Sequence, residues 1–94
     1  MKVVIKKSTN RKKKYMAIFT DKDIKKTTHF GASGMSDYTK HNDKERKERY
    51  LKRHKKNENW DKYMTAGSLS RYILWNKETL KDSIKDYKNR FRLD

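Results

Sequence analysis

The side chains of this sequence that could take part in chemistry are mainly cationic, and four of them recur at helical spacing. Arg46, Arg49, Arg53 and Lys56 occupy positions i, i+3, i+7 and i+10, which a helix would place on one face. A row of guanidinium and ammonium groups binds the phosphates of a nucleic-acid backbone and needs no special pocket. This spacing therefore predicts a phosphate-binding face.

The same segment also has an ordinary structural interpretation. Glu45 precedes Arg49 by four residues, and Glu48 precedes Lys52 by four, so each pair could form a surface ion pair. The cationic face would then be a solvated surface. In either interpretation Tyr50, Leu51 and His54 lie on another face, which can dock on the sheet. Both interpretations stay open at the level of the sequence.

A second group of cations surrounds a predicted turn near the N-terminus. Lys6 and Lys7 precede the turn, and a run of four cations follows at residues 11–14. We predict phosphate contacts from three members of this run, Lys12, Lys13 and Lys14. Basic runs of this kind also serve as localisation signals, and a basic loop can simply keep a protein in solution.

Other chemistry has weaker support in the sequence. The glycine-containing segment 31–41 could present consecutive backbone N–H groups to an anion, although an ordinary turn explains it as well. His41 with Asp37 and Asp43 could hold a metal ion in a nuclease. However, the three histidines do not share a ligand spacing on one element, and the chain has no cysteine. We therefore expect no enzyme, no metal site and no cofactor.

Composition narrows the choice of partner. The chain has 94 residues, with 27 Lys and Arg against 12 Asp and Glu, and a formal net charge of +15. A domain this basic repels itself and attracts polyanions. Apolar residues make up only 32% of the chain, and none of its apolar runs is long enough to span a bilayer. We expect one basic domain over residues 1–94, with a thin core and no transmembrane segment.

Two kinds of element must position these cations. Segments rich in β-branched and aromatic residues predict three short strands at Lys2–Lys6, Lys14–Thr20 and Lys26–Phe30, which would form an antiparallel meander. Three helices are predicted to follow, over Asp43–Lys56, Thr65–Trp75 and Lys77–Phe91. The fold class is therefore α+β, with a small three-stranded sheet followed by three helices.

Helix starts and aromatic positions complete this prediction. Asn42 fits the N-cap of the first helix, while the second helix starts at Thr65 and the third at Asn76. Trp60, Tyr63 and Tyr38 fall in or near loops, where aromatic rings could stack on unpaired bases, although burial in the core is the more common role.

Several segments from Lys26 onward carry a family resemblance. They are the run 26–39 (KTTHFGASGMSDYT), residues 43–50 (DKERKERY) with Arg53-His54, and residues 65–70 (TAGSLS) with Leu74-Trp75. Together they resemble a family of short, basic, uncharacterised proteins of large nucleocytoplasmic DNA viruses, the giant viruses, over roughly residues 14–91. The relatives tend to have a proline after the Asn-Trp pair, where this chain has Asn59-Trp60-Asp61. The resemblance implies a viral protein near a genome or a virion, and it brings no catalytic residues.

These observations predict a non-enzymatic protein that binds nucleic acid largely independently of sequence, and double-stranded DNA rather than RNA. Such a protein could package or condense a viral genome. The alternative is a structural virion or scaffold protein whose basic face binds acidic capsid proteins or anionic lipid. An exposed sheet edge would also allow a homodimer. We expect the protein in the virion or in the host nucleus or cytoplasm, and not secreted.

Overall fold

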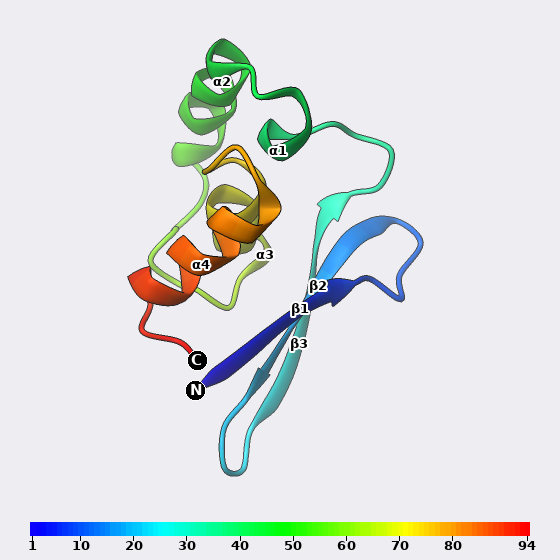
Figure 1. Ribbon diagram of the computed structural model, residues 1–94, viewed down its shortest axis with the longest axis vertical. Helices are drawn as coiled ribbons and strands as arrows, with labels where there is room; N and C mark the ends of the chain where they lie inside the picture. The colour runs from blue at the N-terminus through cyan, green and yellow to red at the C-terminus, as the bar shows by residue number, and fades with distance from the viewer.

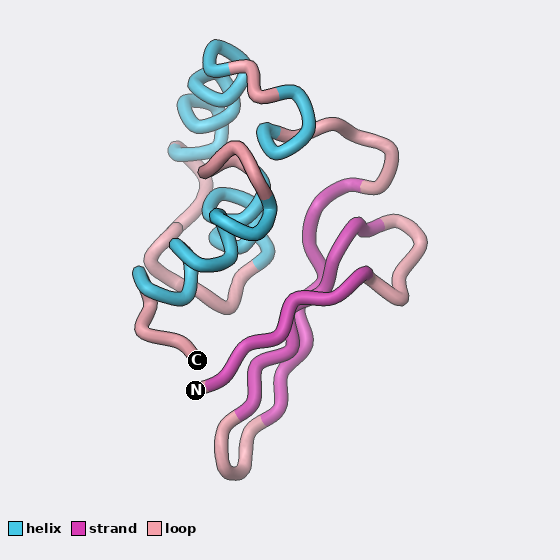
Figure 2. Tube along the Cα trace, viewed as in Figure 1, coloured by secondary structure: helices cyan, strands magenta, loops and turns pink.

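The computed structural model describes residues 1–94 and shows a small sheet beside a group of short helices (Figure 1). The strands are β1 (Lys2–Lys7), β2 (Lys13–Thr20) and β3 (Lys25–Ala32), and they precede every helix. They pair in the order β1-β2-β3, and both pairs are antiparallel. The predicted α+β class and the three-stranded meander are confirmed (Figure 2).

The helical part differs from the prediction in number and in its boundaries. Four α-helices, α1 (Tyr38–His41), α2 (Lys44–Lys55), α3 (Ala66–Leu69) and α4 (Leu80–Arg90), replace the three that were predicted. A π-helical turn, η1 (Ser70–Leu74), continues α3. The additional helix, α1, lies in the segment that the sequence indicated to be a loop. It forms there because the Asp37 side chain caps its first turn.

Two predicted helix starts were wrong, and one is confirmed. Asp43 caps α2 by accepting hydrogen bonds from the N–H groups of Glu45 and Arg46. Asn42 instead ends α1 in a left-handed conformation. Thr79, not Asn76, caps α4. Thr65 caps α3 as predicted.

One apolar core joins the sheet to the helices. The helices cover one face of the sheet, as Figure 1 shows. Alternate residues of the strands supply Val3, Ala17, Phe19 and Phe30, because successive side chains of a strand point to opposite faces. The helical side supplies Leu69, Ile73, Leu74 and Tyr87, and the C-terminal segment adds Leu93. The segment 68–75 is thus central to the core.

Different segments of the chain contact the two edges of the sheet. The backbone of Asp94 exchanges hydrogen bonds with β1, donating to the Met1 carbonyl and accepting from the Val3 N–H. These two bonds cover the start of the β1 edge. On the other edge, the Thr28 hydroxyl of β3 donates to the Met64 carbonyl.

The three strands contain seven lysines and no acidic residue. None of the helices is long and apolar enough to cross a membrane.

Candidate nucleic-acid interface

Helix α2 presents the cations that the sequence placed on one face. Arg46, Arg49, Arg53 and Lys56 are all exposed, and Tyr50 is the buried residue of this helix. The helix forms here because Asp43 satisfies two free N–H groups at its start, and the following residues have good helix propensity. The basic face is therefore open to solvent along the length of α2.

The buried side of α2 docks on aromatic rings of the helical part. The Tyr50 ring stacks on Trp75 with 4.3 Å between ring centroids and on His54 with 4.0 Å. Lys47 also points inward, and its Nζ donates to the Asn76 carbonyl at 2.6 Å. Tyr50 was expected to dock α2 on the sheet, and the Trp75 contact corrects this expectation. Trp75 follows η1, so the aromatic stack anchors α2 to the helical part of the core.

Burial on this side of α2 changes the titration of its groups. Burial, assisted by the charges of Arg71, Lys77 and Lys44, lowers the pKa of Lys47. Burial raises the pKa of Tyr50 to about 12. The two sides of α2 therefore differ in solvent exposure. The arginine side is solvated and cationic, whereas the side with Lys47 and Tyr50 is turned toward the protein interior.

The ion pairs expected on α2 are absent. The chain contains three salt bridges, and none joins Glu45 to Arg49 or Glu48 to Lys52. Among all Lys and Arg side chains, only Lys14 and Arg90 lie within salt-bridge distance of a carboxylate. This leaves 25 of the 27 without an acidic partner. The α2 face can still be a solvated surface, but the two ion pairs that this interpretation proposed, Glu45–Arg49 and Glu48–Lys52, do not form.

The β1–β2 hairpin shapes the second group of cations. The Ser8 Oγ accepts from the Asn10 N–H, and the Asn10 Oδ1 accepts from the Lys12 N–H. These local bonds form a tight turn and leave Arg11, Lys12 and Lys13 exposed. Lys12 and Lys13 are therefore accessible, as a phosphate contact requires.

Lys14 is placed differently from its two neighbours. Its Nζ lies 2.6 Å from Oδ2 of Asp37, and the two side chains are only 11% and 2% exposed. The Asp37 carboxylate also accepts from the N–H and the hydroxyl of Thr39. Lys14 was predicted to contact phosphate, but its ammonium group ties β2 to the start of α1. We therefore leave it out of the proposed interface.

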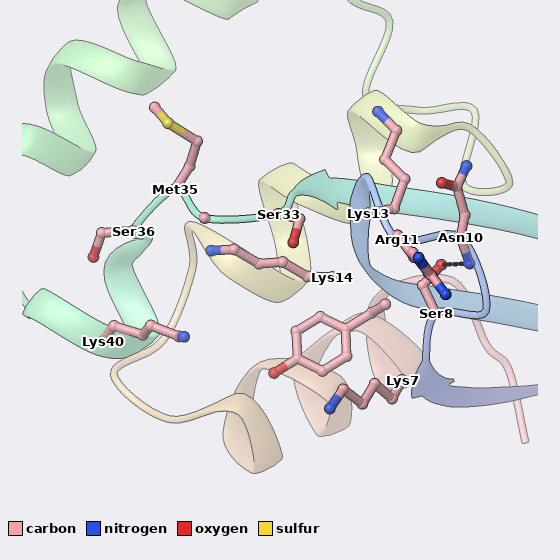
Figure 3. Close-up of a pocket in the computed structure, with 12 residues that line it drawn as sticks. Lys7, Ser8, Asn10, Arg11, Lys13, Lys14, Ser33, Met35, Ser36 and Lys40 are labelled. Carbon is pink, nitrogen blue, oxygen red and sulfur yellow. Dashed lines mark hydrogen bonds between the residues drawn. The ribbon is translucent and has the colours of Figure 1, made fainter.

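A cleft lies between the hairpin and the loop that leads from β3 to α1 (Figure 3). Its volume is about 830 Å³. Five cations line it, and no carboxylate does; they are Lys7, Arg11, Lys13, Lys14 and Lys40. The polar lining also includes three serines, Ser8, Ser33 and Ser36. A concave surface with charges of one sign concentrates the electrostatic field, so this cleft is a strong attractor for anions.

Sequence reasoning missed part of this cleft. Lys40 was not selected, although it lies in a segment that was considered for anion binding. It is far from residues 7–14 along the chain, and the turns at Gly31 and Gly34 and the helix α1 bring it beside them. The run 33–36 contributes side chains to the cleft, so the segment considered as an anion-binding loop does reach the cationic site.

The residues considered for metal-assisted catalysis have other partners. Asp37 binds Lys14, and the Nδ1 of His41 accepts the Asp43 N–H at 2.9 Å. No group of three His, Cys, Asp or Glu side chains in the chain could hold a metal ion. These residues therefore serve the local structure around α1.

The aromatic residues considered for base stacking lie mostly inside the protein. Tyr38 is buried, and Tyr63 packs against Phe19 and Phe91 with ring centroids 5.8 and 5.5 Å apart. Trp60 is half-buried, and the Arg71 guanidinium lies over its ring. Burial lowers the pKa of Arg71. The rings of Tyr38 and Tyr63 are thus used in packing, which is the role that the sequence favoured for aromatic residues over base stacking.

Comparison with known proteins gives a family but no activity. A model of a family of unknown function, DUF5754, matches residues 3–54. This region contains the sheet except Lys2, all of α1, and α2 except Lys55, so it includes the cations of the hairpin and all of those on the α2 face except Lys56. No curated protein and no solved structure matches the chain.

Proposed function

The chain belongs to DUF5754, a family of unknown function, and from its own surface we propose that it is a non-enzymatic protein that binds nucleic acid through the phosphate backbone. It binds double-stranded DNA in preference to RNA and largely independently of sequence. The observation that carries this proposal is the lack of direct ion pairing, since 25 of 27 cations have no carboxylate within salt-bridge distance and the net charge is +15. A polyanion would relieve the resulting repulsion and would release its counterions.

The length of the α2 face supports a duplex as the partner. Arg46 and Lys56 are ten positions apart, which corresponds to about 15 Å along a helix. Duplex DNA carries about nine phosphate charges over that length. The major groove of DNA admits a helix, whereas that of an RNA duplex is too deep and narrow for side chains to read. α2 therefore fits DNA better than RNA.

The viral resemblance adds a biological setting to this proposal. A small basic protein of a large DNA virus would coat or condense the genome, in the virion or in the infected cell. In this setting the exposed cations of α2 and of the hairpin act together as backbone contacts. Arg46, Arg49 and Arg53 form the centre of the proposed interface, and Lys12, Lys13 and Lys56 extend it.

A salt titration tests the proposal. Binding is measured by fluorescence anisotropy on a short DNA duplex, the matching RNA duplex and an acidic protein of similar charge. If about five to eight phosphates are neutralised, the logarithm of affinity falls with the logarithm of salt concentration at a slope of about −4.5 to −7. We expect tighter binding to DNA than to RNA and weak binding to the acidic protein. Equal affinity for all three would instead favour a scaffold role with acidic protein partners.

Matched variants locate the interface. The variant R46Q/R49Q/R53Q removes three charges from α2, and K22Q/K81Q/K85Q removes three exposed charges from the β2–β3 turn and α4. The first should make the slope less steep by about 2.7, because each lost phosphate contact removes about 0.9. The second should change it little. Equal losses in both variants would show that charge acts diffusely, and unchanged binding in both would contradict the proposed function.

A further inference from the structure

The cleft beside the hairpin differs from the α2 face in shape, and the difference points to a different ligand group. The α2 face is a convex row of cations that can follow a continuous backbone. The cleft is concave and open to solvent, and residues of the β1–β2 hairpin, the loop 33–36 and Lys40 of α1 line it (Figure 3). A concave surface of this size fits the end of a strand better than the convex side of a continuous duplex.

The cations of the cleft converge from separate elements. Lys7 extends from β1, Lys14 from β2 and Lys40 from α1, and Figure 3 shows their side chains reaching toward the space between them. Neither Lys7 nor Lys40 has an acidic partner. Lys14 is held in place by Asp37 at the base of this arrangement. The arrangement therefore keeps two free ammonium groups near a third that is fixed.

Hydroxyl groups and an aromatic ring complete the lining. The side chains of Ser33 and Ser36 make no hydrogen bond within the protein and can donate to an anion, whereas the Ser8 hydroxyl already bonds with His29. Tyr15 also lines the cleft. The volume of about 830 Å³ falls within the range of roughly 300–1,000 Å³ that is usual for small-molecule sites. The cleft therefore has room for a terminal nucleotide as well as its phosphate.

We propose that this cleft binds a phosphate monoester at the end of a nucleic-acid strand. A terminal monoester carries about −1.5 to −2 charges at neutral pH, compared with about −1 for an internal diester, and it offers three oxygen acceptors. Several convergent cations favour the group with the higher charge density. This inference rests on the proposed function, because it assigns the cleft to the same nucleic acid that α2 contacts.

Strand ends of different chemistry test the assignment in the full chain. The probes are a single DNA strand of about 12 nucleotides with a 5′-phosphate, the same strand with a 5′-hydroxyl, and a 5′-hydroxyl strand longer by two nucleotides. The longer strand matches the total charge of the phosphorylated one. We expect the phosphorylated strand to bind about tenfold tighter than either control, which is the effect of about one additional charge-assisted hydrogen bond. AMP alone should bind much more weakly than the phosphorylated strand.

Neighbouring lysines provide matched variants. K7Q/K40Q removes the two free ammonium groups of the cleft, while K6Q/K44Q removes two exposed charges, one and four residues away along the chain, that do not line it. Thermal unfolding checks that both variants fold. The preference for a 5′-phosphate should disappear in K7Q/K40Q and remain in K6Q/K44Q.

The outcomes separate this inference from the proposed function. Salt-dependent binding of all strands without a preference for the phosphorylated end would overturn the assignment of the cleft and leave backbone binding intact. A preference that survives in K7Q/K40Q would also overturn it, as would AMP binding as tightly as the phosphorylated strand. Failure of every strand and duplex to bind would overturn the proposed function itself.

Discussion

At the scale of single residues, three consecutive lysines in the same run have different environments. Lys12 and Lys13 are exposed, while Lys14 is paired with the buried carboxylate of Asp37. The reason is the pairing of β2 with β3, because Lys14 lies beside Gly31 near the end of β3, from which the chain turns toward Asp37. A cationic run is therefore not a uniform surface, and only some of its members are available to a ligand.

Removing the Lys14 charge should destabilise the protein. K14Q leaves the Asp37 carboxylate buried without its cation, and we expect a loss of about 3 kcal/mol in the free energy of unfolding, measured by urea denaturation. K13Q is the matched control, and it should change stability by less than about 0.5 kcal/mol, because Lys13 is exposed. If K14Q is as stable as K13Q but binds DNA more weakly, Lys14 is a phosphate contact after all.

At the scale of elements, the end of β3 decides the position of the cleft. Gly31 has a φ of +79°, and a Cβ there would lie 2.8 Å from Cδ1 of the buried Leu74. Gly34 has a φ of +83°, and a Cβ there would meet nothing within 4 Å. The chain thus bends twice, once against the core and once in solvent, and both bends carry the loop 33–36 to the hairpin.

The two glycines provide a test of this close packing. Both G31A and G34A introduce the cost of a side chain at positive φ, about 1–2 kcal/mol. Only G31A also forces a methyl group against Leu74. We therefore expect G31A to be less stable than G34A by about 1–3 kcal/mol. Urea denaturation of both variants measures the difference. Equal stabilities would show that the Leu74 side chain or the helical part accommodates the added methyl group without cost.

Helix α2 illustrates how an element combines two roles. Its inner side is held by the stacked rings of Tyr50 and Trp75, and its outer side carries the arginines. The aromatic contact fixes the direction of the exposed face, so the interface depends on residues that do not touch the ligand. Substitutions at Tyr50 would therefore affect stability and binding together, which is why the binding tests use the exposed arginines.

At the scale of the whole molecule, the excess of positive charge opposes the compact state. The net charge is +15, and most cations lack an acidic partner. Without a polyanion, these charges repel one another through solvent at distances that salt can screen. The free protein should accordingly be less stable at low ionic strength.

Thermal unfolding at different salt concentrations checks this expectation. The midpoint should rise when NaCl increases from about 0.02 M to about 0.2 M, because the screening length falls from about 20 Å to about 7 Å. The variant K22Q/K81Q/K85Q should show a smaller rise, because its net charge is lower. A midpoint that falls with added salt would mean that favourable ion pairs, and not repulsion, dominate the electrostatics of the fold.

Local patterns in the sequence were sufficient to predict much of this fold. The β-branched and aromatic residues of Lys14–Thr20 and of the other two short segments predicted the meander, because strand preference depends on residues close together along the chain. Thr65 capped its helix as predicted for the same reason. Asn42 and Asp43 are adjacent and both suit an N-cap, so a short-range pattern could not choose between them.

Charge and helical spacing, which the sequence alone determines, predicted the exposed face of α2. The tertiary structure decided which surface that helix would dock on and which cations would remain free. Lys14 became part of a buried pair, and Lys40 joined Lys7 at the cleft, because contacts between distant segments depend on how β3 turns at Gly31 and Gly34. Spacing along one element is a property of the chain, but the convergence of separate elements exists only after the core has formed.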